Sequence, residues 1–177
     1  QFLTGTAGEK TYVEIETIEH FTFNVLLSCA IGVVSPDGSL VLRIYYARNV
    51  YTVTFNENGG NRIGGGELTQ KIKYQANATA PQLAKDGHSY VFDKNFDNIT
   101  GDTIVNAIWQ ANQYTITFVL NNGEQDKIIT QSFGDAILDI ETPTKVGYEF
   151  KGWDKEIPST MPAKNIIVSA IWESNLD

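Results

Sequence analysis

Three oxygen-bearing side chains at alternate positions imitate the start of a calcium-binding loop. Asp93, Asn95 and Asp97 supply the carboxylate and amide oxygens that Ca²⁺ prefers as ligands. The pattern then fails, because Asn98 stands where such a loop requires glycine and Ile104 stands where it requires a bidentate glutamate. We therefore predict a solvated turn at this position and no metal site.

The run Gly59–Gly66 has the composition of a phosphate-binding loop, in which backbone N–H groups surround an anion. No Gly-Lys-Ser/Thr triplet follows it, and the next residues show no helical pattern. We therefore predict a flexible loop between two hairpin strands, with no nucleotide or other cofactor. Arg62 is the cationic residue of this run, and we expect it to contact a ligand if the loop takes part in binding.

Cysteine and histidine side chains are the remaining candidates for catalysis. Cys29 is the single thiol, and His20 and His88 are the two histidines. A catalytic pair or triad needs a nucleophile, a base and a group that orients the base, and no carboxylate accompanies these residues in a recognisable motif. We therefore predict no catalytic residues and a protein that is not an enzyme. One cysteine also excludes an internal disulfide and a thiolate metal site.

Three tryptophans offer flat aromatic surfaces on which sugar rings could stack. Trp109 and Trp172 end equivalent segments, which favours packing within or between repeated units over ligand binding. Trp153 and His88 have no residue of the same type at the matching place in the other unit. We expect these two, together with Arg62, to be the positions of ligand contact if the chain binds one.

The elements that would position these residues repeat along the chain. Tyr51–Phe55 and Tyr114–Phe118 have nearly the same sequence, and 114 − 51 = 63. The closing segments end at Trp109 and Trp172, which are also 63 residues apart. A fixed period of this size is typical of a tandem array of small units. Recurring residues are therefore expected in the core of each unit, whereas a catalytic site is expected to be unique.

Within each unit, apolar and polar residues alternate with a period of two, which predicts half-buried strands. We expect strands at 51–55, 68–74, 103–109, 114–120, 128–133 and 166–172. The segments Ala80–Gly87 and Glu141–Gly147 each contain a proline and end at glycine. Each is therefore expected to hold at most a short helical turn in a tight crossover.

The first fifty residues follow the same plan in divergent form. Tyr46 stands five residues before Tyr51, the spacing by which the closing tryptophan of the second unit precedes the third. A turn at Pro36–Gly38 is expected to lead into a strand over Ser39–Tyr46. We therefore predict a partial or divergent repeat at 1–50 and repeat units at 51–113 and 114–177.

Composition narrows the classes of function. Hydrophobic residues make up 42% of the 177 residues, which is enough apolar material for packed domains. Thirteen Lys and Arg against 21 Asp and Glu give a net charge of −8, which opposes nucleic-acid binding through phosphate contacts. No apolar run approaches the roughly 20 residues of a membrane span, so we expect no membrane insertion of this segment.

The order of these motifs resembles the internalin-type B-repeat family, also called the Listeria-Bacteroides repeat. The resemblance rests on a Tyr-Thr-Val/Ile-Thr-Phe opening, a Pro-x-x-x-Gly-Tyr-x-Phe-x-Gly-Trp middle and an Ala-Ile-Trp ending. The motifs are most complete between Tyr114 and Trp172. The second unit departs by having Phe92 in place of the middle tryptophan. Residues 1–50 resemble a mucin-binding-protein-like repeat. The resemblance implies β-grasp-like units in multi-repeat bacterial surface proteins, without catalytic residues.

We therefore expect a mainly β protein, α+β at the level of one unit, built of small β-grasp-like repeats arranged head to tail. The expected function is that of a stalk or spacer and adhesion surface on a bacterial cell or in the extracellular space. Expected partners are neighbouring repeats and a host or matrix protein or glycan, with no nucleic acid and no cofactor. The alternative is a specific glycan- or peptide-binding module that uses exposed aromatic residues or a sheet edge.

Overall fold

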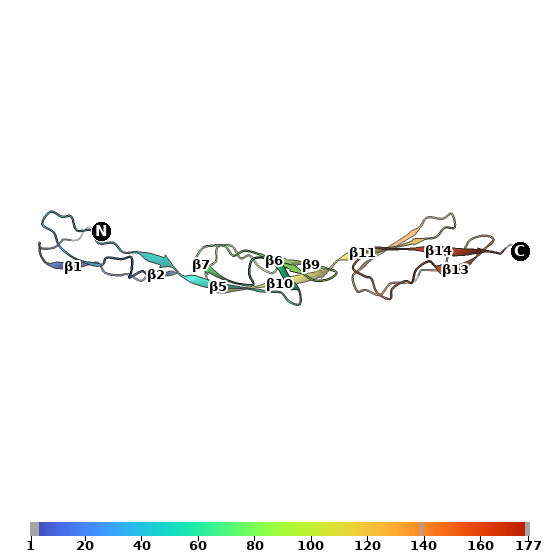
Figure 1. Cartoon of the computed structure of the whole chain (residues 1–177), viewed down its shortest axis with the longest axis horizontal. Helices are drawn as coiled ribbons and strands as arrows, with labels where there is room; N and C mark the ends of the chain where they lie inside the picture. The colour runs from blue at the N-terminus through green and yellow to red at the C-terminus, as the bar shows by residue number, and fades with distance from the viewer. Residues whose placement is uncertain (1–3, 139, 176–177) are drawn as a thin grey trace. The chain divides into compact units, whose positions relative to one another are not determined.

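The computed structural model describes residues 4–138 and 140–175, and these residues form strands β1 to β14 without a helix (Figure 1). This confirms the prediction of a mainly β repeat protein. In the described residues each repeat is all-β and not α+β, since the segments between its strands form turns, bends, single bridges and irregular chain.

The strands divide among the three parts of the sequence. The first part contains β1 (Lys10–Tyr12), β2 (Phe21–Phe23), β3 (Ile31–Val33) and β4 (Tyr46–Arg48). The second contains β5 (Val50–Asn56), β6 (Asn61–Gly65), β7 (Thr69–Lys73), β8 (Pro81–Ala84), β9 (His88–Phe92) and β10 (Thr103–Ala111). The third contains β11 (Gln113–Val119), β12 (Lys127–Ser132), β13 (Tyr148–Trp153) and β14 (Ile166–Ser174).

Both complete repeats are built on a four-stranded sheet with the same strand order. The order is β7-β5-β10-β9 in the second repeat and β12-β11-β14-β13 in the third. In the third repeat the central pair is parallel, with Phe118 opposite Val168, and the two outer strands are antiparallel to their neighbours. The first and last strands of a repeat therefore lie side by side at the centre of its sheet.

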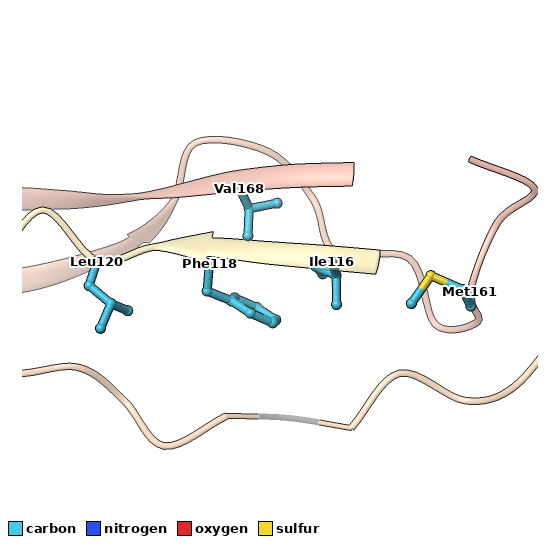
Figure 2. Packing of buried hydrophobic residues seen from close by; sticks show 5 residues of the cluster. All are labelled: Ile116, Phe118, Leu120, Met161 and Val168. Carbon is cyan, nitrogen blue, oxygen red and sulfur yellow. The ribbon is translucent and has the colours of Figure 1, made fainter. Parts of the chain in front are cut away.

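The core of the third repeat comes from alternate residues of these central strands. Ile116 and Phe118 are buried, and Figure 2 shows them with Leu120 on one side of the chain, as a period-two strand requires. Val168 and Met161 complete the buried cluster. The second repeat buries Val53, Phe55 and Val105 at the equivalent positions 63 residues earlier. The recurring residues are therefore core residues.

The recurring tryptophans also tie the last strand of each repeat to its first hairpin. The Trp109 Nε1–H group donates to the carbonyl oxygen of Glu57 at 2.8 Å, and the Trp172 Nε1–H group donates to that of Leu120 at 2.9 Å. Both indoles are half-buried. Packing within or between units was predicted for these two residues, and the structure shows packing within the repeat. The two acceptors are equivalent, since 120 − 57 = 63.

The prediction of a flexible loop over Gly59–Gly66 is wrong. Residues Asn61–Gly65 form β6, which pairs with β8 in a two-stranded sheet. The same pairing makes Pro81–Ala84 a strand and not a helical turn. Glycine allows this packing, because a Cβ at Gly60 would lie 2.1 Å from the Trp109 ring and one at Gly64 would lie 2.9 Å from the Gln82 side chain.

The predicted strand over Ser39–Tyr46 is wrong except at its end. The strand β4 begins at Tyr46, and the preceding residues pair with the facing chain through a single bridge between Cys29 and Arg43. Asn24–Ser28 forms a turn, closed by the Ser28 N–H donating to the Asn24 carbonyl at 3.1 Å, which prevents a longer ladder. By contrast, Phe23 lies opposite Tyr46 as Phe150 lies opposite Trp172, so β2 and β4 match the last hairpin of a complete repeat.

Packing divides the chain into two compact units. The first holds the chain up to Asn56 with Gly65–Ala80 and Lys94–Val105, and the second holds Glu57–Gly64, Pro81–Asp93 and the chain from Asn106. The division falls inside the second repeat and not at either junction between repeats. The boundaries 1–50, 51–113 and 114–177 stay a prediction.

The core of the third repeat predicts a large effect of one truncation. Phe118→Ala removes a fully buried ring and should lower the free energy of unfolding by about 3–5 kcal/mol. Ile128→Ala in the neighbouring strand is the control, because Ile128 is 65% exposed and should cost less than about 1 kcal/mol. Urea unfolding of both variants checks this, and equal costs would contradict the assigned core.

Candidate functional site

A single residue separates consecutive repeats. Asn49 stands between β4 and β5, and Asn112 stands between β10 and β11. The chain therefore passes from the last strand of one repeat into the first strand of the next with no flexible linker. These junctions recur with the repeat and are not part of the core of either repeat, so we treat them as the candidate functional site.

The backbone of each linker asparagine bonds to residues that flank two different strands. The N–H group of Asn112 donates to the carbonyl of Gly87, and its own carbonyl accepts from the N–H group of Phe133, both at 2.8 Å. In an antiparallel ladder one residue exchanges both bonds with a single partner. Here the two bonds go to two residues. Gly87 lies directly before β9 and Phe133 lies directly after β12, so the two residues must lie next to each other. We call this arrangement the junction clasp.

The first junction contains the same clasp. The N–H group of Asn49 donates to the carbonyl of His20 at 2.8 Å, and the Asn49 carbonyl accepts from the N–H group of Tyr74 at 2.8 Å. His20 and Gly87 are thus equivalent, and both have left-handed backbone angles, with φ of 64° and 66°. The clasp therefore requires a left-handed residue just before the strand, where a side chain is strained and glycine is favoured.

The aromatic residue of the clasp packs onto the left-handed residue. A Cβ placed on Gly87 would lie 2.2 Å from the Phe133 ring, so glycine is needed for this approach. At the first junction the imidazole of His20 instead stacks on Tyr74, with ring centroids 4.2 Å apart and an interplanar angle of 15°. The His20 ring also shares a hydrogen bond of 2.7 Å with the Tyr51 hydroxyl, which holds it in place.

His88, predicted from the sequence as a ligand contact, lies in the second junction. Its ring meets Phe133 edge to face, with centroids 5.5 Å apart. Its Nδ1–H group donates to the carbonyl oxygen of Asp86 at 2.7 Å, because a carbonyl can only accept. The structure therefore places His88 in packing between repeats, and its role toward a ligand stays a prediction.

Arg62 and Trp153, the other two predicted contacts, lie in separate surroundings. Arg62 is half-buried on β6, where its backbone N–H donates to the Glu57 carboxylate. Trp153 is half-buried against Phe118 and Phe150, with ring centroids 5.1 and 5.3 Å away. Trp153 therefore packs against the core of the third repeat.

The register explains why Trp153 seemed to break the period. Trp153 lies opposite Ala170 as Phe92 lies opposite Ala107, so the two aromatic residues are equivalent. The one-residue difference in length is a β-bulge between Phe150 and Gly152, where Gly152 has φ of 111°.

The residue added by the bulge, Lys151, is held between two carboxylates. Its Nζ atom lies 2.5 Å from Glu149 and 2.8 Å from Glu173. Hydrogen bonds to Glu149 and then to Glu173 raise the pKa of the Lys151 ammonium. This group is exposed, so the ion pairs shape the local charge and contribute little to stability.

An open hollow of about 600 Å³ lies beside the last hairpin of the third repeat. Tyr148, Trp172 and Lys145 line it together with polar residues that include Asn122 and Glu149. The Lys145 ammonium lies 4.5 Å from the centroid of Tyr148 and 5.8 Å from that of Trp172, within the range of cation–π attraction. The equivalent Lys85 lies 5.8 Å from the centroid of Trp109, so the lysine–tryptophan contact recurs in the second repeat.

The described residues hold few other chemical features. They contain no group of three or more His, Cys, Asp or Glu side chains placed to hold a metal ion. The thiol of Cys29 is exposed. In the same described residues, no helix is long and apolar enough to cross a membrane.

Sequence reasoning missed the clasp, although one signal for it was present. Asn49, Asn112 and Asn175 follow the last strand of each part and are spaced by the 63-residue period. The Asn175 N–H group donates to the carbonyl of Gly147 at 3.0 Å, which is the first half of the clasp. The recurrence of asparagine could have identified these positions. Their main-chain hydrogen bonds could not be predicted, because such bonds do not depend on residue type.

Comparison with known proteins identifies a family and two relatives. A family model described as the Listeria-Bacteroides repeat domain matches residues 51–111 and 114–170. A relative from Evansella cellulosilytica named "Putative membrane protein" is 28% identical over 147 residues, covering 72% of this chain and 22% of the relative. Another from the same organism, named "Putative Gly-rich membrane protein", is 28% identical over 158 residues, covering 78% and 18%. The chain thus spans about a fifth of the length of these relatives.

The junction predicts unequal effects of one substitution at two glycines. Gly87→Ala and Gly147→Ala both place a Cβ on a left-handed residue, which costs about 1–2 kcal/mol. Only Gly87→Ala also drives a methyl group into the Phe133 ring, which should add about 1–3 kcal/mol, since a Cβ at Gly147 would meet no described atom within 4 Å. Urea unfolding measures the difference, and equal costs would show that the ring does not sit on Gly87.

Proposed function

Because the chain belongs to the Listeria-Bacteroides repeat domain family, we propose that it is a non-enzymatic segment of a bacterial cell-surface protein that acts as a stalk or spacer and presents an adhesion surface. A stalk must hold its shape where its units join. The observation that carries the proposal is the junction clasp, which occurs with the same hydrogen bonds at Asn49 and Asn112.

The small size of the repeats supports this role. A domain of about 60 residues buries only about 60% of the surface of its unfolded chain and is marginal alone. In tandem arrays, contacts between neighbours add to the stability of each repeat. The clasp supplies such a contact at each junction, and each junction lies inside one compact unit. The array is therefore stabilised by joining its repeats.

The names of two relatives support an envelope location, and the charge is compatible with it. Both relatives from Evansella cellulosilytica carry the words "membrane protein" in their names, and this chain spans about a fifth of each. A net charge of −8 on 177 residues favours a solvated surface that repels other anionic surfaces. We place this segment outside the membrane, where it separates other parts of the protein and meets host or matrix partners.

The spacer function predicts a fixed distance across the second junction. Spin labels at Val91→Cys and Ile128→Cys, in a Cys29→Ser background, occupy exposed positions of β9 and β12 on either side of the clasp. Pulsed electron paramagnetic resonance should give a narrow distribution of distances between the two labels. A four-residue Gly-Ser insertion between Asn112 and Gln113 should broaden it, because the two ladders then no longer share one residue.

The matched control is the same insertion between Gly123 and Glu124. Both residues are exposed in the loop between β11 and β12, which contributes nothing to the clasp. This insertion should leave the distribution narrow, since surface loops tolerate added length. A distribution that is already broad in the uninserted chain would refute the spacer function.

The hollow beside Tyr148 supports a second candidate function, the binding of a glycan or peptide. Its aromatic walls and the polar residues Asn122 and Glu149 suit a ligand that has flat apolar faces and hydroxyl or amide groups. The Nε1–H group of Trp172 already donates to Leu120, whereas Tyr148 is 42% exposed, so we expect a ligand to contact Tyr148.

A binding assay on glycan and peptide arrays separates the two functions. If the hollow binds a ligand, Tyr148→Ala should weaken binding by about tenfold, the loss expected when a central aromatic contact is removed. Tyr45→Ala is the control, because Tyr45 has a similar exposure of 45% and lies outside the hollow. Saturable binding that survives Tyr148→Ala would exclude the hollow as the site.

A further inference from the structure

Two exposed apolar positions recur in all three parts of the chain. The first position is held by Val41, Ile104 and Ile167, which are 62%, 60% and 55% exposed. The second is held by Tyr45, Ile108 and Ile171, which are 45%, 53% and 45% exposed. Both sets follow the repeat period, since 104 − 41 = 63, 167 − 104 = 63, 108 − 45 = 63 and 171 − 108 = 63. Recurrence is therefore found on the surface as well as in the core and at the junctions.

In the third repeat these residues lie on the outer face of the sheet. Along β14, Ile167 and Ile171 alternate with the buried residues of the strand, so their side chains point away from the core. Thr117 lies beside Ile167 on one neighbouring strand and opposite Ile128 on the other. A row of uncharged β-branched side chains therefore crosses three strands of this face.

Strand propensity alone does not account for the recurrence. β-branched residues favour strands, but threonine has this property without exposing an apolar side chain of the size of isoleucine. In the first part, moreover, Val41 and Tyr45 lie outside the described strands, so no strand has to be stabilised at either position. The property that recurs at these positions is therefore an exposed apolar surface.

The outer face of the second repeat carries positive charge beside its isoleucine. Thr52 and Ile104 each precede a buried residue of their strand, so both point to this face. The Lys71 ammonium donates to the Thr52 hydroxyl at 2.7 Å, and Lys73 follows two residues later on the same strand. The Asp102 carboxylate accepts from the Thr52 N–H group. Two lysines against one carboxylate leave this face with an excess of one positive charge.

The outer face of the third repeat carries the opposite sign. Glu149 lies opposite Glu173 on the face that carries Ile171. Lys151 forms ion pairs with both carboxylates, so two negative charges surround one positive charge. The outer faces of the two complete repeats are thus both apolar and are complementary in charge.

We propose that the outer face of the second repeat, around Ile104 and Lys71, docks on the outer face of the third repeat, around Ile167 and Glu173, of a second copy of this chain. The proposal rests on the proposed adhesion function and names its surface and its partner. Sheets pack face to face through interdigitating side chains of the type that recurs here. The partner is a second copy because each copy carries both complementary faces.

The size of the sheets makes a single contact weak. Four strands about 4.8 Å apart, each of about seven residues at about 3.3 Å, present roughly 400 Å² on one face. Two facing sheets bury roughly 800 Å² in total, less than the roughly 1,200–2,000 Å² of stable interfaces. Copies held on one cell surface have a high effective concentration, so several weak contacts act together. The net charge of −8 does not prevent contact, because charges more than about 8 Å apart are largely screened at physiological ionic strength.

Sedimentation equilibrium of the whole chain, in a Cys29→Ser background, tests the apolar part of the contact. The chain should associate reversibly as its concentration rises to about 1 mM. Ile104→Ser combined with Ile167→Ser should weaken this association about tenfold, because it removes the centre of both faces. The control is Ile63→Ser with Val146→Ser, which changes two aliphatic residues that are 68% and 100% exposed and lie outside the four-stranded sheets. Circular dichroism and urea midpoints check that all variants fold.

A charge exchange tests which faces meet. Lys71→Glu with Lys73→Glu makes the second face negative and should weaken association about threefold or more. Adding Glu149→Lys and Glu173→Lys to the same chain should restore it, because the two faces are again opposite in sign.

The control for charge is Lys127→Glu with Lys164→Glu, which gives the chain the same net charge as the lysine variant of the second face. Both lysines are exposed, and Lys127 lies opposite the buried Phe118, on the other side of its sheet. This control should leave association unchanged. A chain that stays monomeric at about 1 mM would overturn the proposal and assign the face to an unrelated partner. Equal weakening by either control, or no recovery after the charge exchange, would also overturn it.

The docking and the spacer function fail in different ways. If the spin-label distances across Asn112, recorded in dilute solution, are narrow and the concentrated chain stays monomeric, the spacer function stands and the docking is wrong. If those distances are broad and the chain still associates through these faces, the docking stands and the spacer function is wrong.

Discussion

The structure depends on one constraint, which is that the last strand of a repeat continues into the first strand of the next through a single residue. That residue has one N–H group and one carbonyl, and both need partners. At Asn112 the two partners belong to different repeats, Gly87 and Phe133. Since both bonds leave the same side of the strand, the two partners must touch. The left-handed turn at Gly87 and the packing of Phe133 follow from that requirement.

The core of each repeat is likewise built from a few short strands. The parallel central pair brings the first and last strands together, so Phe118 and Val168 pack at the centre although they are far apart in the sequence. The indole of Trp172 then fixes the end of the first strand by bonding to Leu120. A repeat with so small a core keeps its shape because both ends of its first strand are held, one by the clasp and one by the tryptophan.

Features that recur with the 63-residue period could be predicted from the sequence. Features that depend on main-chain hydrogen bonds between distant residues could not. The strands and core at Phe55 and Phe118 followed from alternation and recurrence, because burial selects residue types. The strand β6 could not be predicted from Gly59–Gly66, since its partner β8 lies beyond the intervening strand β7, which belongs to another sheet. The extra residue of β13 was visible as a difference in length. Its assignment to a bulge at Gly152 required the register of the facing strand.

The clasp also changes how a break in the period should be interpreted. His88 and Tyr148 hold one position in two repeats, yet one packs against Phe133 and the other is exposed. The difference in residue type between repeats is therefore not by itself evidence for a ligand site. The position accepts any flat ring that can meet an edge, since Phe21 serves equally well in the first part. A residue that differs between repeats can satisfy the same physical requirement, so function must be argued from the neighbours that each residue contacts.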